Sequence, residues 1–168
     1  GAVFRLLLPA LDSDEPDVEV LARTAARQRP SAALEVLLVE DDEMVRGIAV
    51  RMLAFMGHSV NAVEDPERAL EVLLSGERVD LLFTDMIMAS AKTGMDLARE
   101  ATALVPDLPI IITSGYVDHG LDGDDHPEGL VFLQKPYSRA RLAEHIALAL
   151  AARLEQQDTR QGAGQGIE

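Results

Sequence analysis

The sequence contains no cysteine and no tryptophan, and only 4% of its 168 residues are aromatic. The absence of cysteine excludes a disulfide framework and any thiolate metal site, and it is compatible with a reducing compartment. Hydrophobic residues make up 48% of the chain, so we expect a core of Leu, Val, Ile, Ala and Met. The length suits one domain with extensions.

Long apolar runs and basic clusters are also missing. No apolar run approaches the roughly 20 residues that span a bilayer, and the N-terminus lacks a signal-peptide pattern. The 15 Lys and Arg residues are outnumbered by 29 Asp and Glu residues, for a formal net charge of −14. This charge opposes binding to nucleic-acid phosphates, although a protein that binds a divalent cation tolerates it. We therefore expect a cytoplasmic chain without nucleic-acid or membrane contacts.

The two ends of the chain differ from its middle. Residues 1–10 are predicted to form a strand that stops at Pro9. Residues 11–33 have the composition of a linker around a possible short helix at 18–28. Residues 155–168 are rich in Gln and Gly and are predicted to be disordered. This division leaves residues 34–154 as the folded domain.

Within this domain, apolar runs typical of strands alternate with helical patterns. Strands are predicted at residues 34–39, 58–63, 79–84, 109–113 and 130–133, and helices at about 42–56, 65–75, 94–104 and 138–154. Gly57 is a helix stop, while Asp65 and Pro66 are a cap and a first-turn proline. Five strands separated by helices predict an α/β fold, a parallel sheet covered on both faces.

One connection departs from this alternation. Between Tyr116 and Gly129 a fourth crossover helix is expected, but Gly120, Gly123 and Pro127 disfavour a regular helix. We predict a loop, or at most one helical turn, in its place.

Chemically reactive residues follow four of the five predicted strands. An acidic run, Glu40–Glu43, follows the first strand, and Asp85 follows the third. Thr113 and Ser114 follow the fourth strand, and Lys135-Pro136 follows the fifth. In open parallel sheets, ligands bind at the carboxyl ends of the strands. We therefore expect these residues to converge on one site.

In this order and spacing, the four groups resemble the response-regulator receiver domain over about 115 residues. The resemblance implies a flavodoxin-like, doubly wound, five-stranded parallel sheet with strand order 2-1-3-4-5. It implies that Asp85 accepts a phosphoryl group to form an acyl phosphate. It also implies a Mg²⁺ site formed by Glu40, Asp41, Asp85 and the main-chain carbonyl of Ile87, because Mg²⁺ prefers oxygen ligands.

The resemblance assigns roles to three further residues. Lys135 pairs with Asp85 at rest and with a phosphoryl oxygen afterwards, and the Lys135–Pro136 bond is cis in the family. Thr113 donates its hydroxyl to the phosphoryl group, and Phe132 occupies the switch-aromatic position. Phe132 can equally be an ordinary core residue. For Asp42 and Glu43 we favour helix N-terminal acids, and for Ser114 a packing role.

Two segments resemble parts of hybrid histidine kinases. Residues 1–9 resemble the final strand of a kinase ATP-binding domain, and residues 113–116 with 132–137 resemble receivers attached to such kinases. The implied partners are the histidine kinase core, in the same parent chain, and a histidine phosphotransfer protein or domain. The fragment itself contains no ATP-binding pattern and is not expected to be a kinase.

Several positions depart from the family pattern. Ala89 stands where the family has proline in Asp-x-x-Met-Pro, so we expect a less rigid loop, and this loop is one residue longer before Gly94. Neither Ile87 nor Gly115 has a side chain that hydrogen-bonds an attacking water, which predicts a long-lived phosphoryl group. Without a fourth helix, the usual dimer through helix four, strand five and helix five is not expected.

Two other functions fit parts of the pattern. One is a receiver that docks on a partner without depending on phosphorylation. The other is a phosphatase of the haloacid-dehalogenase class, which also uses Asp, Thr or Ser, Lys and Mg²⁺. That class needs an Asp-x-Asp motif on its first strand, whereas the lone Asp85 ends the third strand here.

Overall fold

The computed structural model describes residues 33–115 and 129–163, with side chains as far as residue 154. The predicted strand at residues 1–10, nearly all of the linker at 11–33 and the predicted loop at 116–128 lie outside the described residues. Within the described part, no helix is long and apolar enough to cross a membrane.

The described part of the chain is organised around five parallel strands. They are β1 (Glu35–Val39), β2 (Ser59–Val63), β3 (Leu81–Asp85), β4 (Ile110–Ser114) and β5 (Leu130–Gln134). Their order in the sheet is β2-β1-β3-β4-β5, and every neighbouring pair is parallel. The predicted α/β class and the strand order 2-1-3-4-5 are therefore confirmed.

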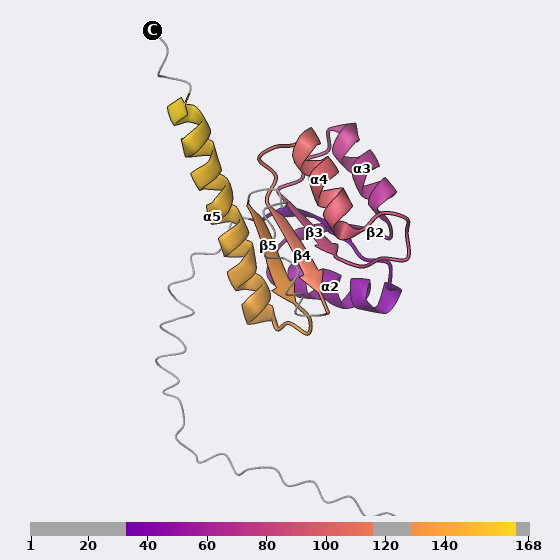
Figure 1. Ribbon diagram of the computed structural model, residues 1–168. Helices are drawn as coiled ribbons and strands as arrows, with labels where there is room; N and C mark the ends of the chain where they lie inside the picture. Colours follow the sequence, from indigo (N-terminus) through magenta and orange to yellow (C-terminus); the bar gives the residue numbers. More distant parts are fainter. Residues whose placement is uncertain (1–32, 116–128, 164–168) are drawn as a thin grey trace, which may run out of the picture. The chain divides into compact units, whose positions relative to one another are not determined.

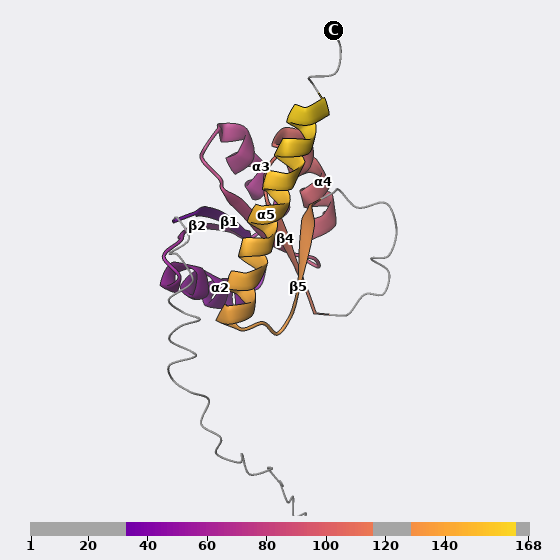
Figure 2. The ribbon, with the colours of Figure 1, turned by 90° about the vertical axis from the view of Figure 1, so that its left-hand side faces the viewer.

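Helices cover both faces of this sheet (Figures 1 and 2). The helices are α2 (Glu43–Phe55), α3 (Pro66–Ser75), α4 (Gly94–Leu104) and α5 (Arg139–Ala163). Buried side chains of α3 and α4 pack with Leu82 and Ile112 on one face. Those of α2 and α5 pack with Phe83 and Ile111 on the other face. Because both faces of β3 are covered, its first four residues are buried.

The helix termini follow the predicted capping chemistry. The carboxylate of Asp42 accepts hydrogen bonds from the backbone N–H groups of Met44 and Val45. Asp65 caps α3 in the same way, with Pro66 in the first turn and Gly76 in the left-handed conformation at the end. These caps start α2 directly after the acid pair at residues 40–41, so the pair lies in the turn between β1 and α2.

The last helix is longer than predicted. The apolar pattern predicts its end at Leu154, with a disordered tail from Glu155, whereas α5 continues to Ala163. The prediction was therefore wrong for residues 155–163. Five of these nine residues are Glu155, Arg160 and three Gln residues, which have good intrinsic helix propensity, so the helix continues where the apolar pattern ends.

Candidate functional site

Asp85 lies at the carboxyl end of β3, beside the end of β4. In the register of these strands Asp85 is paired with Thr113. The Thr113 hydroxyl donates to Oδ1 of Asp85 at 3.2 Å, and the backbone N–H of Met86 donates to the same oxygen at 2.9 Å. The second oxygen, Oδ2, lies 3.0 Å from Nζ of Lys135. Residues from three segments therefore orient the Asp85 carboxylate.

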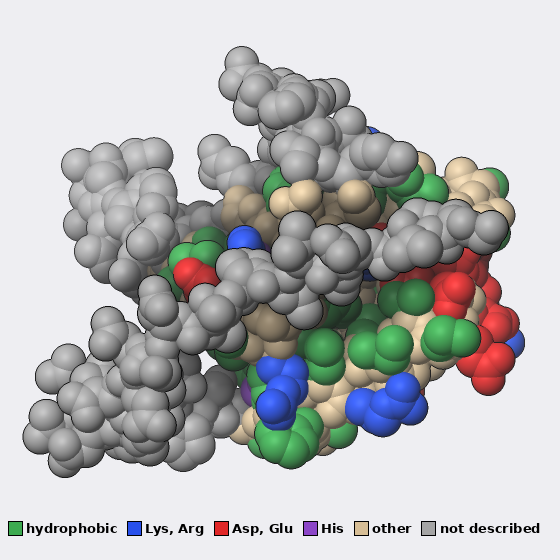
Figure 3. All heavy atoms as spheres, turned by 90° about the horizontal axis from the view of Figure 1, so that it is seen from below, with side chains coloured by type: hydrophobic (Ala, Val, Ile, Leu, Met, Phe, Trp, Pro, Cys, Tyr) green, Lys and Arg blue, Asp and Glu red, His purple; other side chains and the backbone are tan. Residues whose placement is uncertain are grey.

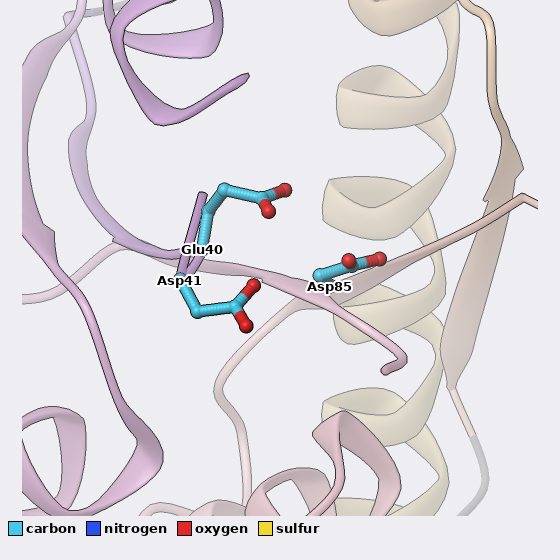
Figure 4. Close-up of side chains that lie close together, drawn as sticks. All are labelled: Glu40, Asp41 and Asp85. Carbon is cyan, nitrogen blue, oxygen red and sulfur yellow. The ribbon is translucent and has the colours of Figure 1, made fainter. Parts of the chain in front are cut away.

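The predicted acid pair faces Asp85 from the turn after β1. Figure 4 shows the carboxylates of Glu40 and Asp41 on one side and that of Asp85 on the other, around a shared space. Ligand atoms of these three acids lie within 4.8 Å of one another. In the described part of the chain, these three side chains are the cluster whose ligand atoms lie close enough together to hold a metal ion.

The donor set of this group suits a hard divalent cation. It offers carboxylate oxygens from three side chains, and Mg²⁺ prefers oxygen ligands and retains several waters. Asp41 is exposed, whereas Glu40 is only 5% exposed. The three acids therefore combine an exposed, a half-buried and a buried oxygen donor, and the residues fit a Mg²⁺ ion.

Lys135 bridges two of these acids. Its Nζ lies 2.9 Å from Glu40 Oε2 as well as 3.0 Å from Asp85 Oδ2. Burial acts to lower the pKa of Lys135, but the hydrogen bonds that its ammonium group donates to Glu40 and Asp85 outweigh burial and raise the pKa. Burial raises the pKa of Glu40, although Lys135 opposes this effect. Lys135 is therefore a firmly protonated cation within an acidic cluster.

The chain around Lys135 is held from both sides. The Lys135 N–H donates to the Ser114 carbonyl at 2.8 Å, and the Lys135–Pro136 peptide bond is cis, in agreement with the family pattern. The ring of Tyr137 packs edge-on against Phe83, with the ring centres 6.0 Å apart. These contacts join the end of β5 to β4 and β3, and they place the amine beside Asp85.

The other predicted residues lie close to this cluster or at its edge. Ile87 follows Asp85 by two residues, and its side chain is 70% exposed. Phe132 is half-buried on β5 and packs against the core cluster that includes Ile112. Ser114 is buried, in keeping with a packing role, and Asp42 caps α2 as predicted.

Arg46 contributes to the site and was missed in the sequence. Its guanidinium donates from Nη1 to the carbonyl of Glu40 at 2.6 Å and to that of Asp41 at 3.1 Å. It therefore holds the backbone of both acids from the first turn of α2. Nothing in the sequence around Arg46 marks the two backbone carbonyls that it contacts.

The sequence singled out Gly94 by its spacing from Asp85, but it did not predict that Gly94 lies against the backbone of Asp85. A Cβ atom at Gly94 would lie 2.0 Å from the Asp85 carbonyl oxygen. The Gly94 N–H also donates to the Met86 carbonyl at 3.0 Å. Glycine at the start of α4 thus lets this helix approach the end of β3.

The fold and the acidic cluster define an α/β domain with a charged site at the carboxyl edge of its sheet. Residues 36–147 match the response regulator receiver domain family. The chain belongs to that family and is a receiver domain of two-component signalling.

The curated relatives include a protein much longer than the matched region and one of about the same length as it. The chain is 32% identical to the sensor kinase CckA of Brucella abortus over 154 residues, which cover 87% of this chain and 16% of CckA. It is 35% identical over 118 residues to the response regulator receiver protein CpdR of Brucella abortus, covering 70% of this chain and 97% of CpdR. The match to CckA is thus with a small part of that protein.

Solved structures give the same family. The receiver domain of the hybrid histidine kinase CckA is 32% identical with a TM-score of 0.57, covering 69% of this chain and 98% of that one. A response regulator receiver protein from Sinorhizobium medicae is 29% identical with a TM-score of 0.66, and the match covers 73% of this chain and 98% of that one.

Proposed function

We propose that Asp85 is the phosphoacceptor of this receiver domain. The observation that carries the proposal is the placement of its carboxylate between Lys135, 3.0 Å away, and the Thr113 hydroxyl, 3.2 Å away, next to two further acids. An Asp85 oxygen attacks the phosphorus atom of a phosphohistidine, the P–N bond breaks, and a P–O bond forms an acyl phosphate. The departing imidazole takes up a proton.

The three clustered acids and the main-chain carbonyl of Ile87 would hold Mg²⁺. When bound, this ion neutralises negative charge on the phosphoryl group during transfer. The protein's own contribution is positional. Arg46 holds the backbone of the acid pair, and Lys135 supplies a fixed positive charge beside Asp85. Together these groups offset the repulsion between an anionic nucleophile and an anionic donor.

Thr113 and Phe132 form the proposed switch. The Thr113 hydroxyl donates to Asp85 in the resting state, and in the phosphorylated state it donates to a phosphoryl oxygen instead. This change of acceptor shifts Thr113 at the end of β4 and alters the space available to the half-buried ring of Phe132 on β5. A local charge change is thereby read at a more distant surface.

The proposed phosphodonor is a histidine kinase core or a histidine phosphotransfer domain, which presents its histidine on a helix. Three large hydrophobic residues of α2 are exposed, namely Met44, Ile48 and Phe55. Figure 3 looks from below onto the side where α2 lies, and hydrophobic side chains gather there beside basic ones. Met44 is three residues from Asp41, so a helix that docks on this apolar face lies close to the acids.

A hybrid histidine kinase is the proposed parent of this domain. The similarity to CckA over 87% of the chain supports this origin, as does the kinase-like pattern of residues 1–9. In such a parent the receiver receives its phosphoryl group in the cytoplasm and passes it on to a phosphotransfer partner.

The test uses acetyl phosphate and Mg²⁺, read by intact-protein mass. We expect the wild type to gain one phosphoryl group and Asp85→Asn to gain none. Asp42→Asn is the matched control, because Asn is also a good helix cap and Asp42 lies next to the acid pair without belonging to the cluster. No gain by the wild type would favour the phosphorylation-independent docking receiver.

The lifetime of the phosphoryl group is a second test of the proposed site. Because neither Ile87 nor Gly115 has a side chain that can hydrogen-bond an attacking water, we expect a half-life of many minutes or longer in the presence of Mg²⁺. A half-life of seconds would contradict this expectation. The decay is followed by intact mass after removal of acetyl phosphate.

A further inference from the structure

Asp41 is joined to the loop after β3 by a single short hydrogen bond. The backbone N–H of Ala89 donates to Oδ2 of Asp41 at 2.7 Å, across 48 residues of sequence. The other oxygen, Oδ1, accepts from the N–H of Asp42 at 3.1 Å. Each oxygen of this exposed carboxylate therefore accepts one backbone N–H, and the direction of the side chain is set from two segments.

The loop that carries Ala89 is itself anchored. Met88 is buried in the core, the N–H of Met86 donates to the Thr113 carbonyl at 2.8 Å, and the N–H of Gly94 donates to the Met86 carbonyl at 3.0 Å. Ala89 thus presents its N–H from a positioned backbone. The same loop contains Ile87, so the bond connects the two segments that supply the proposed metal ligands.

This bond depends on the residue type at position 89 in an unusual way. Every amino acid except proline carries the donor, since proline has no backbone N–H. The receiver pattern Asp-x-x-Met-Pro has proline at this position, where this chain has Ala89. The sequence alone suggested a less rigid loop for that reason, whereas the structure shows a hydrogen bond that proline could not donate.

We propose that the Ala89 N–H is a positioning group that orients Asp41 for Mg²⁺. The proposal rests on the metal site of the proposed function. A carboxylate oxygen has two lone pairs, so Oδ2 can accept the N–H and still face a cation. Carboxylates that bind metals are themselves commonly hydrogen-bonded, and loss of such a partner typically lowers metal affinity about 10- to 100-fold. Orientation by Ala89 also removes side-chain freedom before the ion binds.

The test measures Mg²⁺ affinity of the full chain by calorimetry, without phosphorylation. We expect Ala89→Pro to bind Mg²⁺ about tenfold more weakly than the wild type. Ala89→Gly is the matched control, because it keeps the N–H and should bind Mg²⁺ nearly as the wild type does. Thermal unfolding in EDTA verifies that each variant is folded.

The outcomes separate this inference from the function on which it rests. If the wild type does not bind Mg²⁺, the proposed metal site is wrong, and the inference fails with it. If the wild type binds Mg²⁺ and Ala89→Pro binds it equally well or more tightly, the metal site stands and the positioning role is wrong.

A second measurement avoids the proline substitution. Hydrogen exchange at the Ala89 amide of the wild type is followed by NMR with and without Mg²⁺. We expect the amide to stay protected when Mg²⁺ is bound, because the bond and the ion share the carboxylate. Loss of protection on Mg²⁺ addition would show that the hydrogen bond competes with the ion, and it would overturn the proposal.

Discussion

The carboxyl ends and the amino ends of the strands, called here the carboxyl edge and the amino edge of the sheet, treat a buried acid and a half-buried acid in opposite ways. At the carboxyl edge, burial raises the pKa of Glu40, and Lys135 only partly offsets this effect. At the amino edge, burial also acts to raise the pKa of Asp80, but the Glu35 N–H at 2.9 Å and the guanidinium of Arg78 outweigh it and lower the pKa. One carboxylate is thus poorly stabilised in its charged form, and the other is well stabilised.

This difference indicates what each edge contributes. The amino edge uses its polar groups to hold strand ends together, as the Asp80 bond to Glu35 illustrates. The carboxyl edge gathers three acids, two of which pair with one lysine, and we expect the burial of these charges to cost stability. A site that receives a cation and an anionic phosphoryl group needs such an excess of unsatisfied charge. Four predictions test the contrast.

The largest effect is expected from Gly94→Ala at the carboxyl edge. The new Cβ would lie 2.0 Å from the Asp85 carbonyl oxygen, a backbone atom that cannot move aside as the end of a flexible side chain would. We expect a loss of about 3 kcal/mol in the free energy of unfolding, measured in urea. Gly47→Ala in α2 is the control. A Cβ there meets nothing closer than an Arg51 atom at 3.9 Å, so we expect a gain of about 0.5–1 kcal/mol.

The next largest effect is expected from Lys135→Met. It leaves Glu40 and Asp85 facing each other without the cation that joins them. We expect a loss of about 2 kcal/mol in urea unfolding, and phosphorylation by acetyl phosphate about 100-fold slower. The control is Lys92→Met, at the chain's other lysine, which pairs with Glu100 on the surface. An equal loss in both variants would contradict the special role of Lys135.

Substitution of the two contrasting acids should give effects of opposite sign. Because the pKa of Glu40 is raised above 4.5, its ionisation costs stability as the pH rises through the raised value. Because the pKa of Asp80 is lowered below 3.8, its ionised form stabilises the fold above that value. At neutral pH we expect Glu40→Gln to gain and Asp80→Asn to lose about 1 kcal/mol in urea unfolding. Effects of the same sign would break the comparison.

The smallest effect concerns His58, which also lies at the amino edge. It is buried, its Nδ1 accepts the Leu34 N–H at 3.3 Å, and burial lowers its pKa from 6.5. Its neutral form therefore contributes stability that is present above 6.5 and is lost as the pH falls through the lower folded value. Between about pH 8 and pH 5, we expect the wild type to lose up to about 1 kcal/mol more than His58→Gln. Parallel pH profiles would contradict this expectation.

Much of the fold was predictable because its signals are local. Helix caps such as Asp42 and Asp65, stops such as Gly57 and Gly76, and apolar strands of four to six residues depend on neighbours in sequence. The end of α5 was not predictable from the apolar pattern, because good helix formers continue a helix beyond the last apolar residues of that pattern.

The site also has features that the sequence predicted and features that it did not predict. The order of acids, hydroxyl and lysine at the strand ends predicted the cluster, since parallel strands bring their carboxyl ends to one edge. The contacts of Arg46, Gly94 and Ala89 were not predictable. A guanidinium, a missing Cβ and a backbone N–H carry no signal in sequence about the atoms that they meet.

Periodicity and strand ends predicted a parallel α/β sheet, the edge at which chemistry is possible and the residue types gathered there, because these signals are local in sequence. The strand order was implied by the resemblance to receiver domains. The tertiary structure decided how these residues are held. It set the bridge from Lys135 to both Glu40 and Asp85 and the bond from Ala89 to Asp41. These contacts join residues 48 to 95 positions apart, and only the packing of the strands and helices fixes distances across such separations.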